Sequence, residues 1–129
     1  TIQIAGAVKN IIAIKSGMYE ALGHKENAKA GLVTGGFKEI LTLSKHFGGN
    51  FETILESAVL GDLLLTCYSK TSRNTKFGYE FALSLEKEIF LANYPYLVEG
   101  AESARLILEW IRLYHLDLPI ISSVAEELQ

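Results

Sequence analysis

The segment 2–22 carries apolar side chains at a helical period, and this pattern limits what the rest of the chain can be. Its apolar residues fall three or four positions apart, and Gly23 follows them as a stop signal: Ile4, Val8, Ile11, Ile12, Ile14 and Met18. This spacing predicts a helix, and an apolar surface that wraps around its first half predicts that the helix is largely buried. Other elements must therefore pack around it on several sides.

The remaining segments repeat the helical period, and no segment alternates with period two over a useful length. The apolar run 62–68 could be a strand or a helix by its pattern alone, but no other segment offers it a partner strand. We therefore predict an all-α domain of about six to eight helices. The expected boundary signals are caps at Asn27, Asn50 and Thr71 or Ser72, breaks at Gly48–Gly49 and Asn93–Tyr96, a short continuation from Ser84, and starts at Gly100 and Pro119. In the helix from Gly100 to about His115, the expected core positions are Ala104, Ile107, Leu108, Ile111 and Leu113.

Composition excludes several classes of protein. A chain of 129 residues fits one domain, and a formal net charge of -3 with scattered basic residues argues against a nucleic-acid partner. No apolar run is long enough to span a membrane. The single Cys67 rules out an internal disulfide and agrees with a reducing, cytoplasmic setting. The three histidines lack the spacing of a metal pair, so we expect no metal site.

Asp62 stands alone among leucines, and Lys9 is the only charge before Lys15 in the first predicted helix. Burying either charge alone is costly, so we predict that they form an ion pair. A lysine in such a pair can act as a general acid or base near neutral pH. The alternative is a purely structural ion pair, or a lysine that reaches solvent along its stem.

Arg73 and Lys76 fall in the first turn of a predicted helix, where the helix dipole disfavours cations. A bound anion would offset this, because free backbone N–H groups, the Ser72 hydroxyl, the Asn74 amide and the Arg73 guanidinium together could hold a phosphate. The alternative is that both cations are simply solvated. No glycine-rich phosphate loop supports the anion site.

Four ordered motifs resemble the C-terminal domain of the bacterial NAD(P)-dependent glycerol-3-phosphate dehydrogenase family. They are GAVKN within residues 6–23, ENAKAGLVTGG, LGDLLLTCYSKTSRN and VEG, and they are similar to the family's GAxKN, NAKAALITRG, GLGDLxxTCxSxxSRN and VEG. The resemblance spans nearly the whole chain. One departure is Gly35, where the family usually has arginine, a change expected to loosen a helix or an ion pair without touching the chemistry. The resemblance implies a multi-helix domain of the 6-phosphogluconate-dehydrogenase-like type.

The resemblance also implies the chemistry at the reacting end of the substrate. Lys9 would protonate the ketone oxygen of dihydroxyacetone phosphate as hydride arrives, giving glycerol-3-phosphate for the synthesis of glycerophospholipid precursors. Asp62 would orient Lys9, while Asn10 and Thr66 would be polar neighbours of the reacting group.

The phosphate and cofactor residues are implied in the same way. Ser72, Arg73 and Asn74 would bind the substrate and its phosphate, and Arg73 would also approach the cofactor, NAD or NADP, with Leu97 and Glu99. In the family an N-terminal Rossmann domain holds most of the dinucleotide, and no such sequence is present here. The chain starts within a helical pattern, so we interpret residues 1–129 as a helical fragment. It would fold but be inactive alone, and a homodimer is a further expectation.

Two other functions remain open at this point. A non-catalytic helical dimerisation or structural domain of a related two-domain dehydrogenase would use the same apolar helices, and a phosphate-sensing regulatory domain would keep only the anion site. Geometry separates them from the enzyme, which requires Lys9, Asp62 and the turn from Arg73 to Asn74 around one cleft.

Overall fold

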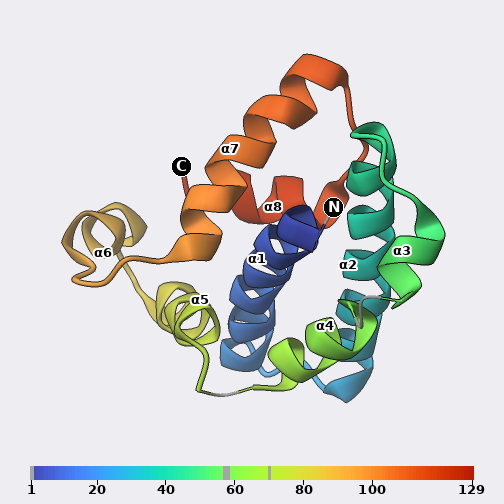
Figure 1. Cartoon of the computed structure of the whole chain (residues 1–129). Coiled ribbons are helices and arrows are strands. Elements are labelled where there is room, and N and C mark those ends of the chain that lie inside the picture. The colour runs from blue at the N-terminus through green and yellow to red at the C-terminus, as the bar shows by residue number, and fades with distance from the viewer. Residues whose placement is uncertain (1, 57–58, 70) are drawn as a thin grey trace.

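The computed structural model describes residues 2–56, 59–69 and 71–129, and within these segments every regular element is a helix. This confirms the all-α prediction. Figure 1 shows the helices in chain order: α1 (Ile2–Ala21), α2 (Glu26–His46), α3 (Phe51–Glu56), α4 (Val59–Tyr68), α5 (Arg73–Leu83), α6 (Lys87–Asn93), α7 (Glu99–Tyr114) and α8 (Pro119–Glu127). In this part of the chain no helix is both long and apolar enough to cross a membrane.

Helix α1 is the centre of the molecule, as its sequence predicts. It packs against α2, α4, α5, α7 and α8, which surround it on several sides (Figure 1). Its fully buried side chains include Val8, Ile11, Ile12 and Ile14. Burying one such side chain contributes roughly 1.5–3 kcal/mol, enough to outweigh the weak helix propensity of β-branched residues. Gly23 lies in the turn that follows α1. Its φ is +76°, a backbone conformation that favours glycine.

Helices α1 and α5 approach each other at two glycines. A Cβ atom built on Gly17 would lie 2.0 Å from the Thr75 carbonyl oxygen, and one built on Gly78 would lie 2.0 Å from the Ile14 carbonyl oxygen. Neither distance is possible for a real side chain, so backbone meets backbone here. The two glycines therefore set the distance between α1 and α5.

Two predicted caps are confirmed and one is wrong. Asn50 accepts a hydrogen bond from the Thr53 N–H at 3.0 Å, and Ser72 accepts one from the Thr75 N–H at 3.2 Å. Helix α2, however, starts at Glu26, with Lys25 as the capping residue and no side-chain bond, so Asn27 already lies inside the helix. Gly23 adopts φ +76° in the turn before α2, and the Lys25 carbonyl accepts hydrogen bonds from the N–H groups of Ala28 and Lys29 at 3.0 and 3.4 Å, so the helix already includes Asn27.

Three other expectations differ from the structure. Helix α4 begins at Val59 rather than 62, and α6 begins at Lys87 because Ser84 ends α5 instead of starting a continuation. The Lys87 ammonium donates to the carbonyls of Phe81, Ala82 and Ser84, which satisfies the end of α5. Leu113 was expected in the core but is 68% exposed, because it lies off the buried stripe of α7, which contains Ala104, Ile107 and Leu108.

Helix α2 continues without a break through Gly35 and Gly36. A Cβ at Gly35 would lie 2.7 Å from the Ile120 Cδ1, the mobile end of a side chain on α8. This position therefore faces α8, and the expected loosening of a helix or an ion pair stays a prediction.

Candidate functional site

The candidate residues on α1, α5 and α7 meet where these three helices converge. The Asn74 Oδ1 on α5 accepts a hydrogen bond of 3.0 Å from the Gly100 N–H in the first turn of α7. The Asn10 Nδ2 on α1 lies 3.5 Å from the Glu99 Oε2, at the start of the same helix. Three segments that are far apart in the sequence are thus joined by polar contacts that involve the predicted site residues Asn10, Asn74 and Glu99.

Glycine is needed at position 100 for this convergence. A Cβ built there would lie 2.7 Å from the Asn10 carbonyl oxygen and 2.8 Å from the Asn74 Oδ1. It would also lie 2.8 Å from the Ile14 Cδ1. The start of α7 can therefore approach α1 and α5 only because residue 100 has no side chain.

A pocket of about 310 Å³ lies beside this junction, between the start of α5 and the segment before α7. Its lining contains two cations, two aromatic rings and an apolar side chain: Arg73, Lys76, Tyr94, Tyr96 and Leu97, with Thr71 and Val98 completing it. The cations suit phosphate groups and the rings and leucine suit a flat ring system, so these residues fit a dinucleotide. Arg73 and Leu97, two of the three predicted cofactor residues, share this pocket.

Lys9 is half-buried on α1, directly before Asn10. It makes no ion pair with Asp62 in the described part of the chain, and Asp62 is exposed. The expectation of a buried Lys9–Asp62 pair is therefore wrong. The reason lies in α4, which turns only Val59, Leu63 and Cys67 inward, four residues apart.

Most of the leucines that made Asp62 look buried are themselves exposed, and only Leu63 of that group is buried. Leu60, Leu64 and Leu65 are exposed by 46%, 48% and 73%. Asp62 instead lies in the first turn of α4, where a carboxylate suits the helix dipole. Thr66 follows it by four residues on the same side of the helix, and no described side-chain contact links either residue to the α1–α5–α7 junction.

The family model described as NAD-dependent glycerol-3-phosphate dehydrogenase C-terminus matches residues 1–129. The chain belongs to this family. This agrees with the four motifs and with the helical fold.

Individual relatives point the same way. The glycerol-3-phosphate dehydrogenase [NAD(P)+] of Rickettsia bellii is 56% identical over 127 residues, which cover 96% of this chain and 40% of the relative. That of Rickettsia prowazekii is 55% identical, over 97% of this chain and 40% of the relative. The crystal structure of glycerol-3-phosphate dehydrogenase from Coxiella burnetii superposes with a TM-score of 0.87 at 32% identity, covering 98% of this chain and 39% of that one. The chain thus spans about 40% of the length of these relatives.

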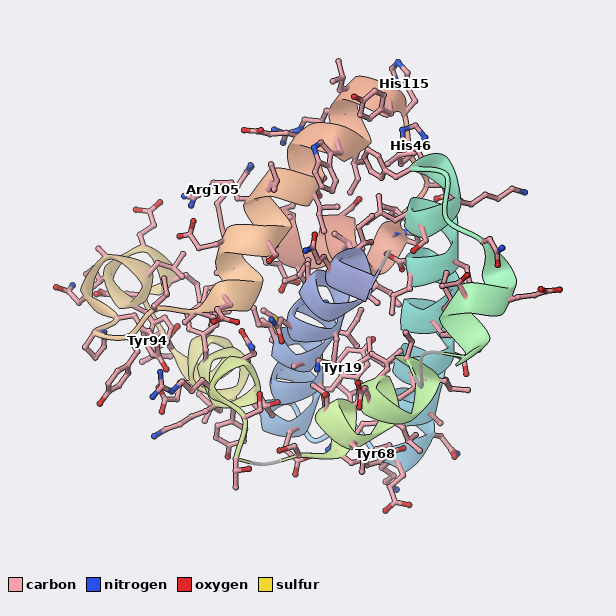
Figure 2. All side chains as sticks on the ribbon, viewed as in Figure 1. Tyr19, His46, Tyr68, Tyr94, Arg105 and His115 are labelled. Carbon is pink, nitrogen blue, oxygen red and sulfur yellow. The ribbon has the colours of Figure 1, made fainter. Side chains whose placement is uncertain are left out.

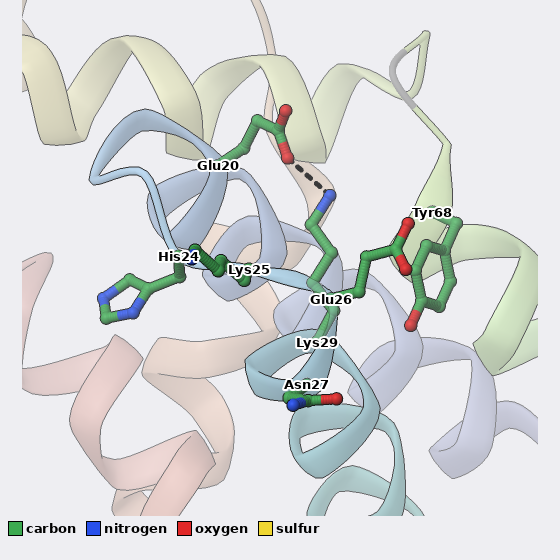
Figure 3. Close-up of a pocket in the computed structure, with 7 residues that line it drawn as sticks. All are labelled: Glu20, His24, Lys25, Glu26, Asn27, Lys29 and Tyr68. Atoms are coloured by element: carbon green, nitrogen blue, oxygen red, sulfur yellow. Dashed lines mark ion pairs between the residues drawn. The ribbon is translucent and has the colours of Figure 1, made fainter.

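The buried charges of this family member are not those that the sequence singled out. Lys29 on α2 is only 9% exposed, and its Nζ lies 2.5 Å from the Glu20 Oε2 of α1. Figure 3 shows this pair at the edge of a cavity of about 620 Å³, with the Tyr68 ring close by. The Lys29 Nζ lies 5.6 Å from the centre of that ring. The pair links α1 and α2 beside the end of α4.

Glu39 is the one carboxylate that is buried among the side chains the structure describes. It is 4% exposed, and its two oxygens accept hydrogen bonds from the N–H groups of Ile120 and Ile121 at 2.8 and 2.9 Å. Burial raises the pKa of the Glu39 carboxyl, the two backbone hydrogen bonds oppose this, and the charge of Asp117 adds to it. Glu39 caps α8 from α2, and the only sequence signal was its place on the apolar side of the α2 pattern, next to Ile40.

Cys67 and the histidines lie in different surroundings. Cys67 is buried, and burial raises the pKa of its thiol to about 11. The histidines sit at helix ends, and Figure 2 shows His46 and His115 together where α2 and α7 end. In the described segments, no three His, Cys, Asp or Glu side chains are grouped so that they could hold a metal ion.

Proposed function

We propose that this chain is the substrate-binding and catalytic half of a glycerol-3-phosphate dehydrogenase, which reduces dihydroxyacetone phosphate with NADH or NADPH. Membership of the family supports the reaction. The observation that carries the assignment of residues is the convergence of Asn10, Asn74 and Glu99 at one junction, beside the pocket that contains Arg73. Glycerol-3-phosphate made in this way would supply glycerophospholipid synthesis.

Lys9 is the proposed general acid. Reduction of the ketone adds a hydride to carbon and a proton to oxygen, and a nicotinamide cofactor held here would supply only the hydride. The proton would come from the Lys9 ammonium, and it would return to the lysine in the reverse reaction. Asn10, the next residue on α1, would hold the reacting end in place. Asp62 and Thr66 would act from α4, with Asp62 orienting Lys9 once both ends of the substrate are bound.

The phosphate end of the substrate would lie at the start of α5. Arg73 supplies a positive charge with several N–H donors, and Asn74 supplies an amide. Ser72 already accepts a hydrogen bond from the Thr75 N–H, so its hydroxyl hydrogen is the part left for a ligand. The free N–H groups of the first helical turn add to the attraction for an anion.

The cofactor would be NAD or NADP, held in this half by Arg73, Leu97 and Glu99. Most of its binding surface would belong to an N-terminal Rossmann domain that precedes this segment in the full-length protein. This accounts for the chain matching about 40% of its relatives' length. Assembly as a homodimer is part of the same proposal.

Substitution of Lys9 in the full-length protein tests the assignment. We expect Lys9→Met to lower kcat for dihydroxyacetone phosphate by roughly 10²- to 10⁴-fold, because the proton donor is lost, with NADH binding retained. Lys38→Met is the matched control, since Lys38 is an exposed lysine on α2, and it should leave kcat unchanged. Unchanged turnover in Lys9→Met would exclude the acid/base role. The chain alone should oxidise no NADH with this substrate.

The second candidate is a non-catalytic helical domain, which is favoured by the lack of an ion pair between Lys9 and Asp62. A non-catalytic role predicts that the Lys9→Met and Lys38→Met variants reduce dihydroxyacetone phosphate equally fast. The same assay therefore separates the two functions.

A further inference from the structure

The last turn of α4 depends on partners from other helices. The final carbonyl groups of a helix have no N–H partner within it, and α4 carries no basic residue in its last turn to face the negative end of the helix dipole. The Thr66 carbonyl accepts a hydrogen bond of 3.2 Å from the Ser69 N–H, just beyond the helix. Residues of α1 and α2 meet the rest of this helix end.

Ser16 of α1 supplies a hydrogen bond to this helix end. Its hydroxyl donates to the Cys67 carbonyl, in the last turn of α4. Both residues are only 1% exposed, and a carbonyl removed from water is costly to leave without a donor. This hydrogen bond therefore ties the end of α4 to the central helix.

Lys29 of α2 supplies a cation to the same helix end. Its Nζ lies 2.5 Å from the Glu20 Oε2 and 5.6 Å from the centre of the ring of Tyr68, the last residue of α4 (Figure 3). Burial raises the pKa of the Cys67 thiol to about 11, and the Lys29 charge acts in the opposite direction, so this charge is felt one residue earlier as well. A cation at the C-terminal end of a helix interacts favourably with the helix dipole.

These polar contacts fix what the apolar stripe of α4 leaves free. The buried side chains of the helix, Val59, Leu63 and Cys67, hold it against the core, but apolar burial has no direction and lets a helix turn or slide. A hydrogen bond has a preferred distance and angle, and both are lost when the helix rotates. Contacts at the last turn therefore set the rotation of α4 about its own axis.

We propose that Lys29 and Ser16 are positioning residues, which hold the last turn of α4 and thereby aim Thr66 and Asp62 at the substrate. The inference rests on the proposed function, in which Thr66 and Asp62 act from α4. Thr66 directly precedes Cys67, and Asp62 lies one turn further back, about 6 Å along the axis. A rotation at the anchored end would therefore move both side chains together.

Ser16→Ala and Lys29→Met in the full-length protein test the inference, at a temperature where each variant is folded. We expect each to lower kcat for dihydroxyacetone phosphate by roughly 10-fold, because small displacements of reacting groups are costly. The KM for NADH should not change, since the proposed cofactor residues lie outside α4. Lys29→Arg keeps the cation and should restore most of the rate. If Lys29→Met fails to fold, Ser16→Ala still decides the question.

Two matched controls lie on α2. Ser44 is fully buried like Ser16, but its hydroxyl has no hydrogen-bond partner among the described residues, so Ser44→Ala should keep kcat. Lys38 is an exposed lysine, and Lys38→Met should keep it as well. A loss of rate in either control equal to that in its partner variant would overturn the inference.

A background that lacks the aimed side chains separates positioning from a general structural role. In a protein that already carries Asp62→Asn and Thr66→Val, Lys29→Met should lower kcat by less than about 2-fold, because residues that act through one another are not additive. A purely structural role of Lys29 predicts the same fall in both backgrounds, and that result would overturn the inference.

Amide hydrogen exchange separates this inference from the proposed acid/base role of Lys9. Ser16→Ala should speed exchange in α4 by roughly 10-fold, the size of one lost buried hydrogen bond, and leave α8 unchanged. Unchanged kcat in Ser16→Ala and Lys29→Met would overturn the inference but not the function, provided that Lys9→Met still loses turnover. Turnover that survives Lys9→Met but falls in Ser16→Ala, with faster exchange in α4, would overturn the role of Lys9 and support the inference.

Discussion

Helices α4 and α5 both pack on the central helix α1, yet they do so in opposite ways. α5 meets α1 through Gly17 and Gly78, where the two backbones touch. α4 meets α1 through a narrow stripe of larger residues and leaves Leu64 and Leu65 exposed by 48% and 73%. The contact through glycines tolerates almost no displacement, whereas a stripe of flexible side chains can adjust.

The two helices also carry different parts of the proposed site. On α5, Asn74 is already hydrogen-bonded to α7 at 3.0 Å. On α4, Asp62 is exposed, and no described contact links its side chain or that of Thr66 to the junction. The part of the site on α5 is thus oriented by the chain itself, while the part on α4 would gain its partners from the substrate or from the proposed Rossmann domain.

The largest effect is expected at the α1–α5 contact. Gly78→Ala places a Cβ 2.0 Å from the Ile14 carbonyl oxygen, and we expect it to lower the free energy of unfolding by about 3 kcal/mol or more, because the helices must separate. Gly61→Ala on α4 meets nothing within 4 Å and should raise it by about 0.5–1 kcal/mol, through helix propensity. Urea unfolding measures both, and equal effects would contradict the contrast between the two helices.

A smaller effect separates the buried carboxylate from the exposed one. In Glu39→Gln one of the two N–H groups at the start of α8 loses its acceptor, so we expect a loss of roughly 1–3 kcal/mol in the free energy of unfolding. Asp62→Asn should change it by less than about 0.5 kcal/mol, because that side chain is exposed. A greater loss for Asp62→Asn than for Glu39→Gln would restore the original assignment of the buried charge.

The pH dependence of stability gives a separate test of Glu39. Burial raises the pKa of its carboxyl in the folded state above the ordinary value of 4.5. The folded state therefore binds this proton more tightly than the unfolded state, and its contribution to stability is greatest below pH 4.5 and is lost as pH rises through the folded pKa. As the pH rises from 4.5 through the folded pKa, the unmodified chain should therefore lose unfolding free energy relative to the Glu39→Gln variant. A flat difference would mean that the pKa is not raised.

The smallest effect is expected on the outer face of α4. Leu65→Gln should change the unfolding free energy of the chain by less than about 0.5 kcal/mol, because the side chain is 73% exposed. Leu63→Ala, two residues earlier on the buried stripe, should cost roughly 2–5 kcal/mol. Thermal or urea unfolding checks both variants. A loss above 1 kcal/mol for Leu65→Gln would show that α4 packs more fully than its stripe indicates.

The helices themselves could be predicted because their signals are local. Apolar spacing identified α1 and its burial, and the side-chain caps at Asn50 and Ser72 mark the starts of α3 and α5. Asn27 failed as a cap because the turn geometry at Gly23 moved the start of α2. Local chemistry therefore predicts that a helix exists better than it predicts its first residue.

The site could be predicted only in part. The motifs pointed to Asn10, Asn74 and Glu99, and these residues do converge. Apolar neighbours in the sequence did not show which charges are buried. Asp62 has leucines around it on both the exposed and the buried side of α4, and it is itself exposed. The only local signal for Glu39 was its place on the apolar side of the α2 pattern, which does not reveal that α8 supplies its partners.

The sequence by itself determined the helical class, the central place of α1 and the family, because periodicity and motifs are properties of the chain alone. Only the tertiary structure decided that Glu39 and Lys29 are buried, and that Gly17, Gly78 and Gly100 let α1, α5 and α7 approach closely. The physical reason is that burial and close backbone contact depend on what another helix brings to a position. A residue's neighbours along the chain do not reveal that partner.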